Sequence, residues 1–90
     1  MSNDETSKRD ALKRELKLMI IYECQKEMQV EDIPDNVPLF GDRSGPELDS
    51  LDALQIAMAV HRKYGKRIQG NTATRNALAT VNALADFILG

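Results

Sequence analysis

A serine between two acids, in the run Asp49-Ser50-Leu51-Asp52, is the part of this sequence whose residue types could carry chemistry. Asp49 is a residue type that caps helices, and Asp52 follows three positions later, so the pair can form an acidic capping box. Ser50 then occupies the first helical position and faces solvent. A phosphoryl group on its oxygen would lie beside unpaired backbone N–H groups at the positive end of the helix dipole. The sequence therefore predicts a place suited to an attached phosphate.

The tripeptide Asp49-Ser50-Leu51 is weak support when taken alone. At average residue frequencies it occurs by chance in about one chain in thirty of this length. An ordinary capped helix is the competing interpretation. The sequence around the serine must therefore decide between the two.

Length and composition limit the class of protein. Ninety residues predict one domain over 1–90, too small for a sizeable catalytic cleft, and 42% hydrophobic with 29% charged residues is typical of a folded chain. The only cysteine, Cys24, excludes an internal disulfide and suits a reducing cytoplasmic setting, with the thiol as a small core residue. The longest apolar run, residues 18–22, predicts neither a signal peptide nor a membrane span.

Charge is unevenly distributed along the chain. The net charge is -2, but residues 27–52 contain eight acids and one base, whereas residues 53–90 contain five bases and one acid. A basic cluster lies further along the sequence from the serine: His61, Arg62, Lys63, Lys66 and Arg67. The cluster is interpreted either as a recognition surface or as a solvated helix end that complements its own dipole. An acidic chain without an aromatic platform does not suit nucleic-acid binding, and a lone His61 does not predict a metal site.

Apolar spacing predicts a small all-α fold. Helices are expected at about 8–28, 50–64, 72–78 and 81–89, with residues 1–7 frayed and Thr80 capping the last helix. Three prolines and two glycines between 29 and 48 predict a long packed loop with a short helical turn near Leu39.

The helical pattern also predicts which side chains are buried. In the first helix Leu18, Ile21 and Tyr22 should widen an apolar stripe, and Lys13 and Lys17 should remain in solvent. In the second helix Leu51 and Met58 fall at the border, and Gly65 should end the helix. The face expected to be buried there contains Ala53, Leu54, Ile56, Ala57, Val60 and Tyr64.

Four segments follow one another in a set order: IPDNVPLFGD at 33–42, LDSLD at 48–52, ALQIAMAV at 53–60 with Tyr64-Gly65 and Ile68 behind it, and Thr80-Val81 before LADFI at 84–88. In this order the chain resembles an acyl carrier protein from about Leu12 to Leu89. The resemblance implies a four-helix bundle of acyl-carrier type, with a long ordered loop between helices 1 and 2 and a short third helix.

The same resemblance implies a carrier that is not itself an enzyme. A phosphopantetheinyl transferase would move 4'-phosphopantetheine from coenzyme A to Ser50, using Mg²⁺ held in the transferase complex, and acyl groups would travel as thioesters on the terminal thiol. Asp49 matches the acid that meets the transferase and its metal. The carrier itself is expected to be a monomer and to bind no metal of its own.

The resemblance also implies two further sets of residues. Acyl-transferring, ketosynthase or acyl-activating enzymes would meet a partner surface made of Leu51, Asp52, Gln55, Met58 and Arg62. An acyl chain would be shielded in a space lined by Ile56, Ala57, Val60, Ile68 and Leu78.

Two departures from the family pattern stand out. Carriers of primary fatty-acid synthesis present acids along the recognition helix, whereas this one carries Gln55 and ends in bases, so its partners should differ. Where the family often has glycine, two residues before the attachment-site aspartate, this chain has Glu47. We expect a specialised carrier of fatty-acid, polyketide or related biosynthesis. An aminoacyl or peptidyl carrier and an unmodified helical interaction module remain the alternatives.

Overall fold

Helices account for the regular structure of this chain in the computed structural model, which describes residues 3–41, 45–68 and 71–90. They are α1 (Asn3–Glu23), the 3-10 helix η1 (Val30–Asp32), α2 (Ser50–Tyr64), α3 (Asn71–Ala77) and α4 (Val81–Leu89). Within the described ranges the extended pairing is limited to one isolated bridge, between Phe40 and Leu48. The prediction of an all-α fold is confirmed. None of the described helices has the length and apolar character needed to cross a membrane.

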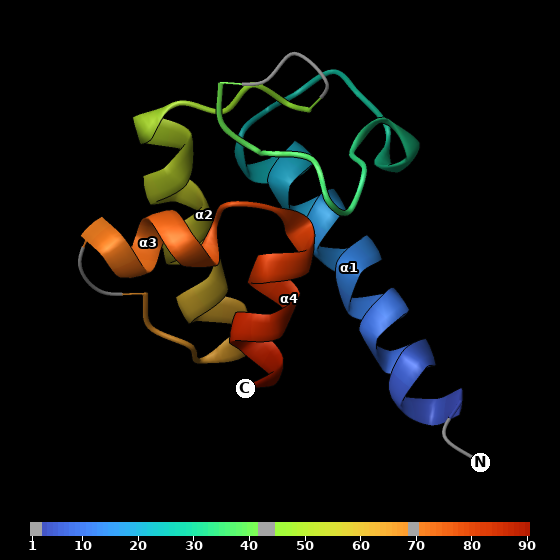
Figure 1. The fold of residues 1–90 in the computed structure, drawn as a ribbon. Coiled ribbons are helices and arrows are strands. Elements are labelled where there is room, and N and C mark those ends of the chain that lie inside the picture. Colours follow the sequence, from blue (N-terminus) through green and yellow to red (C-terminus); the bar gives the residue numbers. More distant parts are fainter. Residues whose placement is uncertain (1–2, 42–44, 69–70) are drawn as a thin grey trace.

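The helices surround one apolar core (Figure 1). Helix α1 packs against α2 and α4, α3 packs against α4, and the connection from α1 to α2 runs across one end of these helices. Every helix except η1 contributes buried apolar side chains or directly adjoins them, and the connection adds three more. The core cluster is Leu12, Leu16, Met19, Ile20, Ile33, Leu39, Leu48, Ile56, Ala59, Val60, Leu78, Val81, Leu84 and Ala85.

The first helix differs from the prediction at both ends. It begins at Asn3, so residues 3–7 are helical rather than frayed, and it stops at Glu23 instead of continuing to about 28. Gln25 adopts a left-handed φ of 53°, and the N–H of Lys26 donates to the carbonyl of Ile21 at 3.0 Å, which closes the helix. Because glycine usually marks this position, a glutamine there offers no sequence signal.

The helical turn that was predicted near Leu39 in the connection lies instead at Val30–Asp32. Gln29 and Asp32 form a reciprocal cap there, with the Gln29 N–H donating to the Asp32 carboxylate at 2.9 Å. Leu39 is instead fully buried and hydrogen-bonded through its backbone to Ala79, with N···O 3.0 Å.

Three apolar side chains that were expected to be buried are exposed. Leu18 is 49% exposed, Tyr22 80% and Leu54 56%. The stripe on α1 is therefore narrower than predicted because α2 and α4 cover only the side that carries Leu12, Leu16 and Met19. The predicted burial of Leu18, Tyr22 and Leu54 is wrong.

Lys13 and Lys17 are not solvated as predicted, because both pair with Asp35 of the connection. The Lys17 Nζ lies 2.6 Å from Asp35 Oδ1, and the Lys13 Nζ lies 3.4 Å from Oδ2. The Asp35 carbonyl also accepts from the N–H of Asn82 at 3.0 Å, so this residue joins α1 to α4. Hydrogen bonding to Lys17, helped by the charge of Lys13, holds the pKa of Asp35 below its ordinary value.

Replacing this carboxylate tests the ion cluster. We expect Asp35→Asn to lower the free energy of unfolding by about 0.5 to 1 kcal/mol near neutral pH, since solvent partly screens the pairs. A lowered folded-state pKa stabilises the fold above the unfolded-state value of 3.8, and this stabilisation is lost as pH falls through the folded-state value. Urea unfolding of wild type and variant at about pH 7 and about pH 2 measures the difference.

The exposed acid Asp10 on α1 provides the matched control. Asp10→Asn should leave stability nearly unchanged at both pH values, because no ion pair joins Asp10 to the residues described. An Asp35→Asn deficit that persists undiminished at the lower pH would contradict an electrostatic origin.

Candidate functional site

The start of α2 is fixed by a reciprocal capping box. Asp49 has extended φ and ψ of -115° and -173°, and its Oδ1 accepts from the N–H of Asp52 at 2.9 Å. Asp52 Oδ2 in turn accepts from the N–H of Asp49 at 3.1 Å. These two hydrogen bonds place exposed Ser50 at the first helical position, as the spacing of the two acids predicts.

The segment that leads into the cap is held by backbone hydrogen bonds. The N–H of Leu48 donates to the carbonyl of Leu39 at 2.8 Å, and the N–H of Leu39 donates to the carbonyl of Ala79 at 3.0 Å. Leu48 is 4% exposed, so its side chain anchors the segment in the core. Ser50 therefore follows a buried anchor by two residues.

Glu47, just before that anchor, adopts a left-handed backbone conformation with φ 51°. A side chain is strained there because its Cβ approaches the following carbonyl, whereas glycine has no such clash. This is the position at which the chain departs from the carrier pattern by having glutamate in place of glycine. The backbone turn that glycine would favour is therefore present without the glycine.

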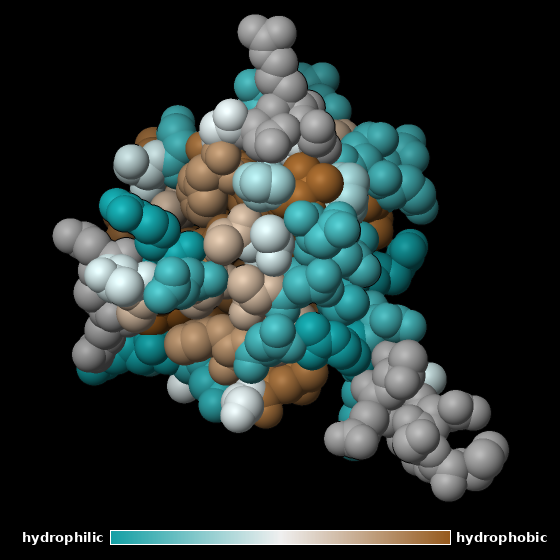
Figure 2. All heavy atoms as spheres, in the orientation of Figure 1, coloured by the Kyte–Doolittle hydropathy of each residue, from teal (hydrophilic) through white to brown (hydrophobic). Residues whose placement is uncertain are grey.

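An open groove of about 630 Å³ begins at Ser50 and passes between α2 and α3. Its walls come from the connection, from one side of α2, and from the segment around α3. The residues are Phe40, Leu48, Asp49, Ser50, Ala53, Leu54, Ala57, Ile68, Thr74 and Arg75. On the face of the molecule shown in Figure 2, apolar residues gather in the middle of the view, over α4 and the neighbouring connection, with hydrophilic residues around them.

The residues predicted to shield an acyl chain fall into two groups. Ala57 and Ile68 line the groove. Ile56, Val60 and Leu78 are fully buried and lie in the closed core. Most of the groove residues that the sequence did not predict lie in irregular segments or in α3. Helical periodicity does not reveal which residues of these segments face the serine.

The predicted partner residues lie on or beside the outer surface of α2. Leu51 is 64% exposed and Met58 55%, and with exposed Leu54 they form an apolar stripe that starts next to the serine. Gln55 is partly buried. Asp52 is engaged in the cap and lies 3.9 Å from the Lys26 Nζ, and exposed Arg62 donates to Glu23 at 3.0 Å.

The end of α2 is as predicted, with Gly65 in a left-handed conformation at φ 68° and its N–H donating to the carbonyl of His61. Tyr64 donates to Glu15 at 2.8 Å, and burial together with this hydrogen bond raises the pKa of the Tyr64 hydroxyl. His61, Arg62 and Lys63 occupy the last turn, where bases complement the helix dipole. Their role as a recognition surface stays a prediction.

Cys24 is half-buried beside α2. Its thiol lies 3.9 Å from the carbonyl oxygen of Asp52, and burial raises the pKa of Cys24 to about 12. A thiol with so high a pKa carries almost no thiolate near neutral pH and is a poor nucleophile. The geometry agrees with the interpretation of Cys24 as a packing residue.

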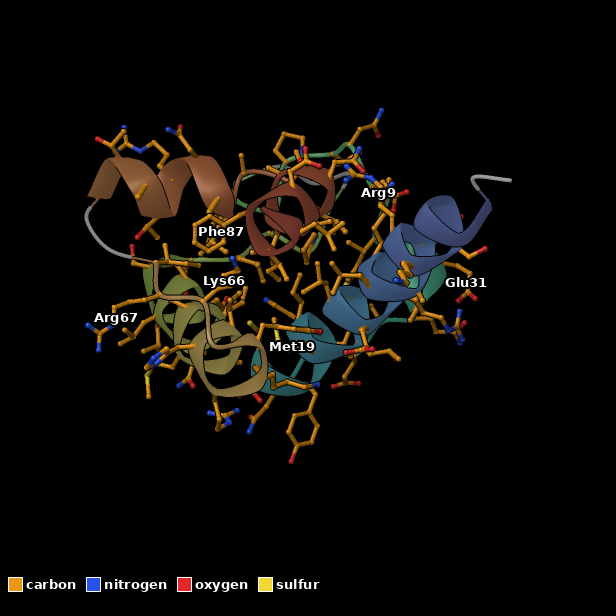
Figure 3. All side chains as sticks on the ribbon, turned by 90° about the horizontal axis from the view of Figure 1, so that it is seen from below. Arg9, Met19, Glu31, Lys66, Arg67 and Phe87 are labelled. Carbon is orange, nitrogen blue, oxygen red and sulfur yellow. The ribbon has the colours of Figure 1, made fainter. Side chains whose placement is uncertain are left out.

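The strained turn before the cap can be tested by Glu47→Gly. Relief of the left-handed strain outweighs the flexibility that glycine adds to the unfolded chain, so we expect the free energy of unfolding to rise by about 0.5 kcal/mol. Glu31→Gly in η1, where the backbone has no positive φ, should instead lower it by about 0.5 to 1 kcal/mol. Parallel urea unfolding curves measure the free energy of unfolding of both variants. Equal losses of stability in the two variants would contradict strain at Glu47; Glu31 is labelled in Figure 3.

Comparison of the chain with protein-family models, with curated proteins and with solved structures finds no match.

Proposed function

We propose that this protein is an acyl carrier whose attachment residue is Ser50, on a four-helix bundle of acyl-carrier type. One observation carries the proposal: an exposed serine is fixed at the first position of a helix and lies at the edge of a groove with mostly apolar walls. The resemblance of the segments around it to those of acyl carrier proteins supplies the identity of the attached group.

The residues present fit a 4'-phosphopantetheine arm. Ser50 is accessible to a modifying enzyme, and the adjoining groove has Phe40, Leu54 and Ala57 on its walls, so part of an attached arm or its cargo can leave water there. When bound, the arm supplies a terminal thiol that holds acyl groups as thioesters. Ser50 and Asp49 are the residues that would hold it and guide its attachment.

Attachment requires a transferase and coenzyme A. The Ser50 Oγ forms a bond to the phosphorus next to the pantetheine, the pyrophosphate P–O bond breaks, and 3',5'-adenosine bisphosphate leaves. The hydroxyl proton passes to a base of the transferase, and Asp49 would meet the transferase and the Mg²⁺ that it holds. The chain's own contribution is to hold the serine rigidly in solvent through the capping box.

The outer surface of α2 is proposed to receive partner enzymes. Its exposed stripe of Leu51, Leu54 and Met58 adjoins the serine, and exposed apolar side chains in a continuous row are typical of interaction surfaces. The basic residues at the far end of α2 would repel a partner built for an acidic helix. We therefore infer acyl-transferring, ketosynthase or acyl-activating partners of specialised fatty-acid or polyketide biosynthesis.

Intact-mass measurement tests the attachment. After incubation with coenzyme A, Mg²⁺ and a broad-specificity phosphopantetheinyl transferase, the wild type should gain one phosphopantetheinyl mass and Ser50→Ala should gain none. Ser7→Ala removes another exposed serine, on α1, and should gain the mass as the wild type does. Asp49→Asn retains a good N-cap residue but loses the charge, so it should fold normally and be modified more slowly.

Two results would count against the carrier. A wild-type chain that gains no mass, although its circular dichroism is helical, would leave the unmodified interaction module as the explanation. An equal gain in Ser50→Ala would place the modification elsewhere.

The groove makes a separate prediction about cargo. Ala57→Leu adds bulk to a groove wall, so long acyl thioesters should lose protection from hydroxylamine while an acetyl thioester is cleaved at the wild-type rate. The measurement is the cleavage rate across a series of chain lengths. Ala73→Leu makes the same change at an exposed site of α3 outside the groove and should change no rate. Equal protection at every chain length in Ala57→Leu would contradict shielding in this groove.

A further inference from the structure

The groove contains one cation among the described residues that line it. Arg75 of α3 faces the same space as Ser50, and the other charged residue there is Asp49. Arg75 is exposed and forms no ion pair with the side chains described in 7–41, 45–68 and 72–90. By contrast, Arg62 and Lys26 lie on the α1 side of α2 and already face Glu23 and Asp52. Arg75 is therefore available to an anion that enters the groove.

Backbone hydrogen bonds bring the segment just after α3 toward the serine. Ala79, two residues beyond the end of α3, is joined to Leu39, and Leu39 is joined to Leu48, two residues before Ser50. These N···O distances are 3.0 and 2.8 Å. Since Phe40 and Leu48 also line the groove, Arg75 shares this groove with the segment that leads into α2.

The negative charges beside Ser50 would make a nearby cation favourable for an attached phosphate. Asp49 and Asp52 put two carboxylates at the helix start, and the segment 27–52 contains eight acids and one base. A phosphodiester on Ser50 would add a further negative charge beside them. The helix dipole favours that charge, but the adjacent carboxylates oppose it. A guanidinium across the groove offsets the repulsion and can donate two parallel hydrogen bonds to phosphate oxygens.

We propose that Arg75 binds the phosphodiester of an arm attached to Ser50 and so positions the first part of that arm along the groove. The inference rests on the proposed carrier function and goes further, because it assigns a phosphate-binding residue on α3. Arg75 acts on the attached group by position and charge, and no bond is made or broken.

Phosphorus NMR on the loaded protein tests the contact. Wild type, Arg75→Gln and Arg75→Lys are converted to the phosphopantetheinyl form, and intact mass verifies loading before each spectrum. In Arg75→Gln the phosphodiester resonance should move toward that of a free pantetheine phosphodiester and show faster local motion. Arg75→Lys should be intermediate, because lysine retains the charge without the planar fork. The difference should shrink in high salt, since the pair is exposed to solvent.

Arg67→Gln is the matched control, because it removes the same charge outside the groove. Figure 3 shows Arg67 extending away from the helices on the α2 side, and it does not line the groove. Its phosphorus spectrum should equal that of the wild type. The unloaded Arg75→Gln protein should unfold at the wild-type temperature, which separates the contact from a loss of fold.

The possible results are distinct. Loaded proteins with the same phosphorus spectrum for wild type and Arg75→Gln would overturn the inference and leave the carrier function standing. Equal changes in Arg75→Gln and Arg67→Gln would also overturn it, since they would indicate a general field effect. A wild type that cannot be loaded would remove both proposals, and the mass measurement identifies that case before any spectrum is recorded.

Discussion

The candidate site depends on one constraint, the pairing of Leu39 with Leu48 in the core. Both side chains are buried, and their backbones join each other and Ala79, just after α3, through hydrogen bonds of 2.8 and 3.0 Å. This pairing holds the part of the connection that leads into α2 against the core. The turn at Glu47 brings the chain to the buried Leu48, and the cap at Asp49 then starts α2 within two residues.

Helix α2 separates two roles by its faces. Ala53 and Ala57 are small, and their size leaves room for the groove between α2 and α3. Leu51 and Met58 lie in solvent on the outer surface, available to another protein. The serine belongs to both surfaces, since it lies at the edge of the groove and at the start of the exposed stripe. The proposed carrier function would use this arrangement, because an arm attached to Ser50 would have to be reached by partners and also sheltered between encounters.

Charge gives the fold an electrostatic polarity. Asp49 and Asp52 lie beside the serine, and the bases of α2 lie at the opposite end of the same helix. Some of these charges are structural. Asp35 pairs with two lysines of α1, and Arg62 pairs with Glu23, so they join elements rather than meet partners. The charges left over for binding are fewer than the sequence suggests, and Arg75 is among them.

The sequence by itself determined the features that depend on near neighbours. The cap at Asp49 and Asp52, the end of α2 at Gly65 and the start of α4 after Thr80 involve residues within a few positions of each other, so local patterns were sufficient. The tertiary structure decided what depends on distant segments. The exposure of Tyr22, the pairing of Lys13 and Lys17 with Asp35, and the presence of Arg75 in the serine's groove all follow from which elements pack together. Helical periodicity identifies a face of a helix, but only packing determines which neighbour covers it.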